Sequence, residues 1–362
     1  MSELWTPGKT GELVTRKGSM RVGGVVIKYC LAEPAFSSSF NTDAIPVLFE
    51  HGVGEIGYQQ VAIIKYLAQE LGCRVVGYNS DLIAAGKKVG PESVNHQREV
   101  YLRVVDATGL GGQPHDVIAH SLGGLTTAAG SLANIGDSED NGHQHTRVGV
   151  VTLLAPATLT PETYLSNFWL DRSRELDLVG RVTSFRAYET DWKKHGRLLA
   201  KMFSKTLMKE LRNGYKDPQT AIAGINIARE MRMISRLPDA FAVLANISTV
   251  PEIINAAKNG VKINLAGGSD DQLFPLATIE EAIRMGIPEI EDVTRPGIAE
   301  IKLLKAKISV VEIVLAGHSS LATNVGKEQL KALVLVHRGI PEGIYISSGS
   351  TKSNAWRTVP TN

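Results

Sequence analysis

The chain has 362 residues, of which 43% are hydrophobic and 21% charged, and its formal net charge is +2 at pH 7. This composition is typical of a globular enzyme with a large core, and the near-neutral charge gives no reason to expect nucleic acid or an anionic membrane as a partner. Two cysteines are too few for a disulfide framework or a four-ligand zinc site. We expect Cys30 and Cys73 to be buried free thiols.

No apolar run in the sequence approaches the roughly 18 residues that a membrane-spanning helix needs. Residues 1–21 are polar and of mixed charge, without the apolar centre of a secretory signal. We therefore expect a cytoplasmic protein with no integral membrane segment. The oligomeric state is not predicted.

Apolar strands and amphipathic helices alternate through the first part of the chain. We expect an antiparallel hairpin at residues 12–15 and 21–31, with its turn at 17–19. Further strands are predicted at residues 46–49, 73–78, 117–119 and 148–154, and helices at 58–71, 91–107 and 124–132. Strands that are apolar throughout and alternate with helices indicate a mostly parallel, doubly wound sheet covered on both faces. Such sheets bind ligands at the carboxyl ends of their strands.

The pattern changes for about a hundred residues after position 156, where helical spacings replace strands. We expect this segment to be a helical cap inserted into the core, with some of its Met, Phe and Trp side chains lining an apolar pocket. Strands resume at 261–265 and 308–315, with a helix and an acidic excursion between them and a closing helix at 327–336. The expected domains are the first part of the core (1–156), the cap (157–260), the second part of the core (261–346) and a flexible tail (347–362).

Residues 117–125 read V-I-A-H-S-L-G-G-L, an apolar strand followed by a tight turn and a helix. This is the small-x-Ser-x-Gly form of a nucleophile elbow, with Ala119 in place of the usual first glycine. Small residues are needed at Ala119 and Gly123, because larger side chains would collide with the neighbouring strand or the helix. The turn would hold the Ser121 hydroxyl above the sheet on a strained backbone. A simpler interpretation of Ser121 is a helix N-cap.

A serine, an acid and a histidine occur in that order, each after an apolar strand: Ser121, Asp271 and His318. This is the order found in α/β-hydrolases. The chain resembles that superfamily, in its capped serine esterase and lipase-like branch, over residues 11–338. The acid lies in a Gly-x-x-Asp-x-x-x-Pro turn and the histidine in a Gly-His pair, as in the family. The resemblance implies an α/β-hydrolase fold with an inserted helical cap and a Ser-Asp-His triad.

The family's oxyanion loop follows the third strand as His-Gly, which His51 and Gly52 match. The resemblance implies that backbone N–H groups of Val53 and Leu122 stabilise the oxyanion, while His51 and Gly52 support the loop. His51 is expected to shape this loop rather than transfer protons.

Some neighbouring residues leave alternatives open. Asp270 is adjacent to Asp271 and is the alternative acid, although the spacing to the proline favours Asp271. His120 abuts the nucleophile but should point away from it. The family's usual Asp-x-x-Gly-x-Gly-x-Ser segment after the fourth strand is absent here, so substrate preference does not carry over from any subfamily.

The expected activity is hydrolysis of carboxylic esters through an acyl-enzyme on Ser121, as in carboxylesterases and lipases. The substrate would be a small-molecule ester or acyl compound, with no cofactor and no metal. A carbon-carbon bond hydrolase or an acyltransferase would use the same triad. A hydrolase fold that serves as a small-molecule receptor with little turnover is the alternative from another class.

Overall fold

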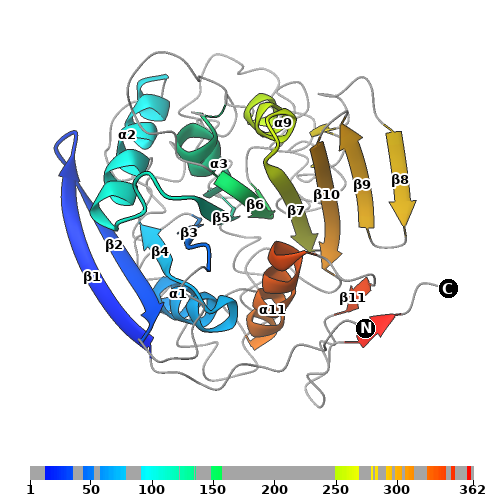
Figure 1. Cartoon of the computed structure of the whole chain (residues 1–362), viewed down its shortest axis with the longest axis horizontal. Coiled ribbons are helices and arrows are strands. Elements are labelled where there is room, and N and C mark those ends of the chain that lie inside the picture. Colours follow the sequence, from blue (N-terminus) through cyan, green and yellow to red (C-terminus); the bar gives the residue numbers. More distant parts are fainter. Residues whose placement is uncertain are drawn as a thin grey trace, which may run out of the picture.

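A twisted sheet of ten strands organises the part of the chain that the computed structural model describes (Figure 1). That part comprises residues 13–35, 44–52, 58–78, 91–121, 123–133, 135, 148–156, 249–268, 279, 282–283, 291–295, 298–303, 306–313, 324–339, 344–346 and 357–359. The strands of the sheet are β1 (Leu13–Val22), β2 (Val25–Pro34), β3 (Val47–Glu50), β4 (Val75–Tyr78), β5 (His115–His120), β6 (Val148–Leu154), β7 (Lys262–Gly268), β8 (Glu291–Arg295), β9 (Ile298–Leu303) and β10 (Ala306–Ile313).

The strands lie side by side in the order β1-β2-β4-β3-β5-β6-β7-β10-β9-β8. The six strands from β4 to β10 run parallel to one another. At one edge β1 and β2 are antiparallel, and at the other edge β9 and β8 are antiparallel. The prediction of a mostly parallel sheet is therefore confirmed. The carboxyl ends of all six parallel strands face the same side of the molecule.

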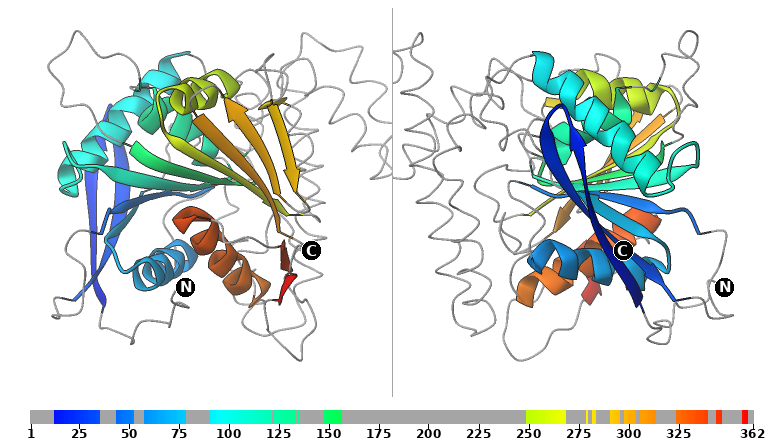
Figure 2. Two further views of the ribbon diagram at one scale, coloured as in Figure 1. Left: turned by 45° about the vertical axis from the view of Figure 1, so that its right-hand side comes forward. Right: turned by 90° about the vertical axis from the view of Figure 1, so that its left-hand side faces the viewer.

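Helices cover both faces of the sheet, as expected for a doubly wound fold (Figure 2). One face carries α1 (Tyr58–Leu71) and α11 (Asn324–Arg338). The other carries α2 (Pro91–Ala107), α3 (Gly123–Thr127), the π-helix η1 (Ala128–Leu132) that continues α3, and α9 (Val250–Lys258). None of the helices in the described ranges is long and apolar enough to cross a membrane.

The core under α1 and α11 follows from the sequence pattern. The spacing of Ile64, Leu67 and Ala68 places them on one face of α1, and all three are fully buried. They pack in one cluster with residues of the central strands, including Phe49 and Ile118. A fully buried Leu, Ile or Phe side chain contributes about 2 kcal/mol to folding. Burial of Cys30 and Cys73 as free thiols in the same cluster is also confirmed.

The edge hairpin β1-β2 turns later than expected. Its turn is Gly23-Gly24, with Val22 paired to Val25, rather than residues 17–19. Both glycines have positive φ angles, 55° and 84°. A two-residue hairpin turn requires such angles to match the twist of the two strands. Gly18 lies inside β1 opposite Tyr29, and a Cβ atom there would lie 2.3 Å from the tyrosine ring. This glycine therefore makes room for an aromatic ring on the neighbouring strand and does not form a turn.

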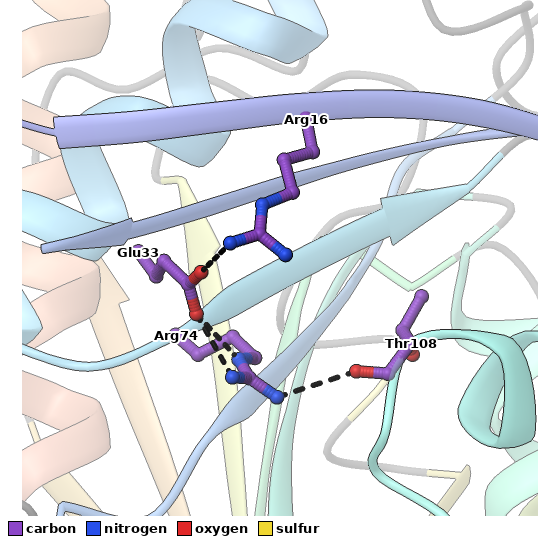
Figure 3. A network of polar contacts seen from close by, with 4 residues as sticks. All are labelled: Arg16, Glu33, Arg74 and Thr108. Carbon is purple, nitrogen blue, oxygen red and sulfur yellow. Dashed lines mark hydrogen bonds and ion pairs between the residues drawn. The ribbon is translucent and has the colours of Figure 1, made fainter. Parts of the chain in front are cut away.

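A charged network joins this hairpin to the sheet (Figure 3). Arg74, just before β4, donates from Nε to Glu33 Oε2 at 2.9 Å, and its second terminal nitrogen lies 2.9 Å from the same oxygen. Arg74 also donates to the carbonyl of Thr108 at 3.3 Å. Arg16 on β1 lies 3.4 Å from the other oxygen of Glu33. The network thus connects β1, β2, β4 and the end of α2.

The second half of the chain departs from the expected pattern at three places. The acidic excursion before the last parallel strand contains the hairpin β8-β9, which extends the sheet by two antiparallel strands. α9, in the range expected for the cap, packs against β7, β10 and η1. The expected flexible tail contains β12 (Arg357–Val359), which pairs with β11 (Ile344–Ile346). The rest of the expected cap, residues 157–248, lies outside the described residues.

Candidate active site

Ser121 lies between β5 and α3, where the expected strand, turn and helix are all present. Its φ is 54°, in the left-handed region that non-glycine residues rarely adopt. The backbone bonds on both sides fix this turn: the Ser121 N–H donates to the carbonyl of Leu154 at 3.0 Å, and the Gly124 N–H donates to the carbonyl of Ser121 at 3.0 Å. The strained serine backbone expected from the motif is therefore observed.

Gly123 is required because the elbow presses against the end of β3. A Cβ atom on Gly123 would lie 2.0 Å from the backbone oxygen of Glu50 and 3.2 Å from that of His51. No side chain fits there without moving the main chain. Ala119 is fully buried in β5 and lies opposite Glu50 in the register of the two parallel strands. The small residues on both sides of the serine therefore allow β5 and α3 to pass close to β3.

Gly52 brings the loop after β3 close to Ser121. A Cβ atom on Gly52 would lie 3.0 Å from Cβ and 3.4 Å from Oγ of Ser121. Since β3 and β5 are parallel neighbours, the residues after both strands lie at the same edge of the sheet. The helices that follow these strands, α1 and α3, cover opposite faces (Figure 2). This is the topological switch point, where open α/β sheets bind their ligands.

His51 is buried, and its Nδ1–H donates to the carbonyl of Gly52 at 2.9 Å. A carbonyl oxygen only accepts hydrogen bonds, so Nδ1 carries the proton. Burial lowers the pKa of His51 to about 4. At neutral pH the imidazole is therefore uncharged and a weak base, which agrees with a role in holding the loop.

Glu50 is a feature that the sequence interpretation missed. Its carboxylate is buried and accepts hydrogen bonds from Tyr78 at 3.0 Å, Thr126 at 2.9 Å, Thr127 at 2.5 Å and, more weakly, Ser131 at 3.5 Å. Burial raises the pKa of Glu50 to about 7, against the opposing effect of the hydroxyl groups. The pKa of Tyr78 is also raised, first by burial and then by the nearby carboxylate. A charged residue at the end of an otherwise apolar strand was the available signal.

No family model and no curated protein sequence matches this chain. Solved structures do match it, at low sequence identity. A proline iminopeptidase from Mycobacterium smegmatis aligns with a TM-score of 0.57 and 13% identity, over 89% of this chain and 98% of that one. A 2-hydroxy-6-oxo-6-phenylhexa-2,4-dienoate hydrolase from a Rhodococcus species aligns with a TM-score of 0.52 and 13% identity, over 90% and 99%. An esterase from another Rhodococcus isolate gives 0.50 and 13%, over 90% and 99%.

The chain has the α/β-hydrolase fold. The resemblance inferred from the motifs around Ser121, Asp271 and His318 is thus confirmed at the level of the fold. At 13% identity these likenesses carry no information on substrate.

The other predicted members of the site lie outside the described residues. These are Asp271, the alternative acid Asp270, His318, and the two oxyanion donors Val53 and Leu122. Asp271 follows β7 and His318 follows β10, and both strands run parallel to β5. Their positions relative to the Ser121 hydroxyl remain predictions.

Two further histidines belong to buried polar contacts away from the elbow. Nδ1 of His115 donates a hydrogen bond to the carbonyl of Gln113. Nε2 therefore carries no proton and accepts a hydrogen bond from the hydroxyl of Tyr101 at 3.0 Å. His337 on α11 lies 2.9 Å from the hydroxyl of Thr152 and 3.4 Å from Asp116. Among the described residues no three His, Cys, Asp or Glu side chains group in a way that could hold a metal ion. In this fold, both histidines connect strands to helices.

Proposed function

We propose that the protein is a serine hydrolase that cleaves carboxylic esters through an acyl-enzyme on Ser121. The observation that carries this proposal is the placement of Ser121 in a left-handed turn at the carboxyl end of β5, beside Gly52 after β3. The elbow and the loop meet at the switch point of an α/β-hydrolase sheet. A strained serine at such a position is the arrangement of an activated nucleophile.

In this mechanism His318 accepts the proton of the Ser121 hydroxyl as the oxygen attacks the ester carbonyl. Asp271 orients the imidazole and stabilises its charged form. The negative charge of the tetrahedral intermediate falls on the backbone N–H groups of Val53 and Leu122. Removal of one oxyanion donor costs about 3 kcal/mol in related chemistry. His318 then donates its proton to the leaving alcohol, and water releases the acid by the same steps.

The close approach of Gly52 to Ser121 supports this assignment of the loop. An oxyanion donor must lie about 3 Å from the position that the carbonyl oxygen takes after attack. A loop whose backbone comes this close to Ser121 can place the next N–H group, that of Val53, within such reach. The neutral form of His51 adds no full charge beside the reacting carbonyl.

The experiment is hydrolysis of a p-nitrophenyl ester series, from acetate to palmitate, by the wild type and by Ser121→Ala. We expect multiple turnovers in the wild type and none above background in the variant. Ser19→Ala, at an exposed serine of the edge hairpin, is the matched control and should retain full activity. The preferred chain length would report the depth of the acyl pocket.

Labelling with a fluorophosphonate, followed by mass analysis of peptides, tests the nucleophile without a substrate. We expect the label on Ser121. Labelling without ester turnover would favour a carbon-carbon hydrolase or an acyltransferase on the same triad. Absence of both labelling and turnover would contradict the proposal and favour a small-molecule receptor.

A further inference from the structure

The buried carboxylate of Glu50 joins the end of β3 to three other segments. It comes from the end of β3 and accepts from Tyr78 at the end of β4, from Thr126 and Thr127 in α3, and from Ser131 in η1. The steps of ester hydrolysis leave this group without a chemical role. Burial of a carboxyl group costs free energy, which these hydrogen bonds offset. The question is therefore what such a group contributes at this position.

The main chain of Glu50 leads directly into the loop that contacts the nucleophile. His51 and Gly52 follow it, and Gly52 lies against Ser121. The side chain of Glu50 points to the helix that begins behind Ser121. One residue is therefore bonded to both parts of the site: through its backbone to the loop after β3, and through its carboxylate to the elbow helix.

The backbone reinforces the same connection. The carbonyl oxygen of Glu50 occupies the space in front of Gly123, where a Cβ atom would lie 2.0 Å away. Thr126 and Thr127 also lie 2.9 Å from the carbonyl of Gly123, so the same hydroxyls contact both the carboxylate and the first turn of α3. A shift of α3 relative to β3 would break several of these contacts together.

We propose that Glu50 is a positioning residue, which fixes the distance between the Gly52 loop and Ser121 by anchoring the end of β3 to α3 and η1. This inference rests on the proposed function, because its kinetic effect requires the loop to carry an oxyanion donor. Oxyanion donors act on charge that exists only in the transition state. Loss of the anchor should therefore lower kcat and leave KM nearly unchanged.

The first test compares Glu50→Gln and Glu50→Leu with the wild type, using p-nitrophenyl acetate. Gln keeps the shape and one accepting oxygen, whereas Leu removes every hydrogen bond. We expect kcat to fall by roughly tenfold or more in Glu50→Leu and by less in Glu50→Gln, short of the roughly 10²- to 10³-fold loss for deletion of an oxyanion donor. If Glu50→Leu fails to fold, Glu50→Gln alone carries the comparison.

Thr152→Val is the matched control. Thr152 is fully buried in β6, a central strand. Its hydrogen-bond partners are His337 on α11 and Asn264 on β7, and neither belongs to the Gly52 loop. We expect this variant to lower the melting temperature and to retain the kcat of the wild type. Equal losses of kcat in Thr152→Val and in the Glu50 variants would mean a general effect of destabilisation and would overturn the proposal.

The second test is amide hydrogen exchange, which needs no enzymatic activity. We expect faster exchange in α3 of Glu50→Gln and unchanged exchange in α11. Unchanged exchange at α3, or a folded Glu50→Leu variant with the kcat of the wild type, would overturn the role of Glu50. If wild-type turnover and labelling of Ser121 are both absent, the proposed function fails, while hydrogen exchange still decides whether Glu50 anchors the elbow.

Discussion

Gly52 and Ser121 come so close that a single methyl group on the glycine would lie 3.0 Å from the serine Cβ. The two residues follow different strands, β3 and β5, and are far apart in the sequence. Contact between them is possible only because residue 52 has no side chain and because the Ser121 backbone takes a left-handed turn. Backbone geometry thus fits Ser121 and the loop after β3 to each other.

The first prediction concerns Gly52→Ala. The new methyl group would crowd the Ser121 side chain, so either the hydroxyl or the loop must move by a few tenths of an ångström. We expect ester hydrolysis to fall by about tenfold or more, since small displacements at a reacting centre are costly. Steady-state kinetics on p-nitrophenyl acetate measures this.

Gly24→Ala is the control for that experiment. Gly24 has a φ of 84° and no atoms near its would-be Cβ, so an alanine there is strained but displaces nothing. It should lose about 1 kcal/mol of stability and keep its activity. Equal activity of Gly52→Ala and Gly24→Ala would contradict the crowding argument.

The second prediction concerns Gly123→Ala. Helix propensity alone predicts that alanine at this position in α3 stabilises the protein by about 1 kcal/mol. The new Cβ would lie 2.0 Å from the carbonyl oxygen of Glu50, which predicts the opposite, because the main chain of either α3 or β3 must move. We expect a loss of several kcal/mol, visible as a lower urea midpoint or as insoluble protein. Stabilisation would show that α3 can move away from β3 freely.

The third prediction concerns stability and pH. Burial raises the pKa of Glu50 from 4.5 to about 7. Between pH 4.5 and about 7, Glu50 is therefore protonated in the folded state and ionised in the unfolded state. The stability from Glu50 is thus fully present below about pH 4.5 and is lost as the pH rises through about 7, by on the order of 3 kcal/mol. The pKa of His51 is lowered to about 4, which gives a slope of the opposite sign between about pH 4 and 6.5.

Because the two slopes oppose each other, the wild type alone is a poor test. The difference in unfolding free energy between the wild type and Glu50→Gln isolates the contribution of Glu50. In urea unfolding from pH 4.5 to 8.5, we expect the wild type to lose unfolding free energy relative to Glu50→Gln as the pH rises. A difference independent of pH would mean that the Glu50 carboxyl titrates normally.

The fourth prediction concerns the charged network at the edge hairpin (Figure 3). Arg74 is 38% exposed and Arg16 is 71% exposed, so solvent screens both of their ion pairs with Glu33. We expect Arg74→Met to cost about 1 kcal/mol, because Arg74 contacts Glu33 through two nitrogens, and Arg16→Met to cost less than about 0.5 kcal/mol. A double-mutant cycle with Glu33→Gln, at low and high salt, measures the pair directly.

The sequence predicted elements best where one physical signal dominates. The helix at 58–71 and the strand at 148–154 were predicted at the residues where α1 and β6 begin and end. Helical spacing of buried apolar residues specifies the first, and an unbroken apolar run specifies the second. The elbow was predicted from small residues around Ser121, since those residues reflect the close contact with Glu50.

The failures have equally physical causes. Gly18 was interpreted as a turn, although it lies in β1 to make room for the ring of Tyr29. β8, E-D-V-T-R, is polar and lies at the edge of the sheet, and its neighbour β9, I-A-E-I-K-L, mixes apolar with charged residues. Neither strand is the unbroken apolar run by which the central strands were predicted. Glu50 was missed because its partners come from β4, α3 and η1, and no local pattern reports contacts between distant segments.

The pairing of β3 with β5 has a consequence for folding kinetics. These neighbours in the sheet are separated in the chain by α1, β4 and α2, so their contact closes a long loop and belongs to the slow, nonlocal class. Helices such as α2 can form early from local contacts alone. Because Gly52 and Ser121 meet only when β3 and β5 pair, recovery of the proposed esterase activity during refolding should lag behind recovery of helical circular dichroism.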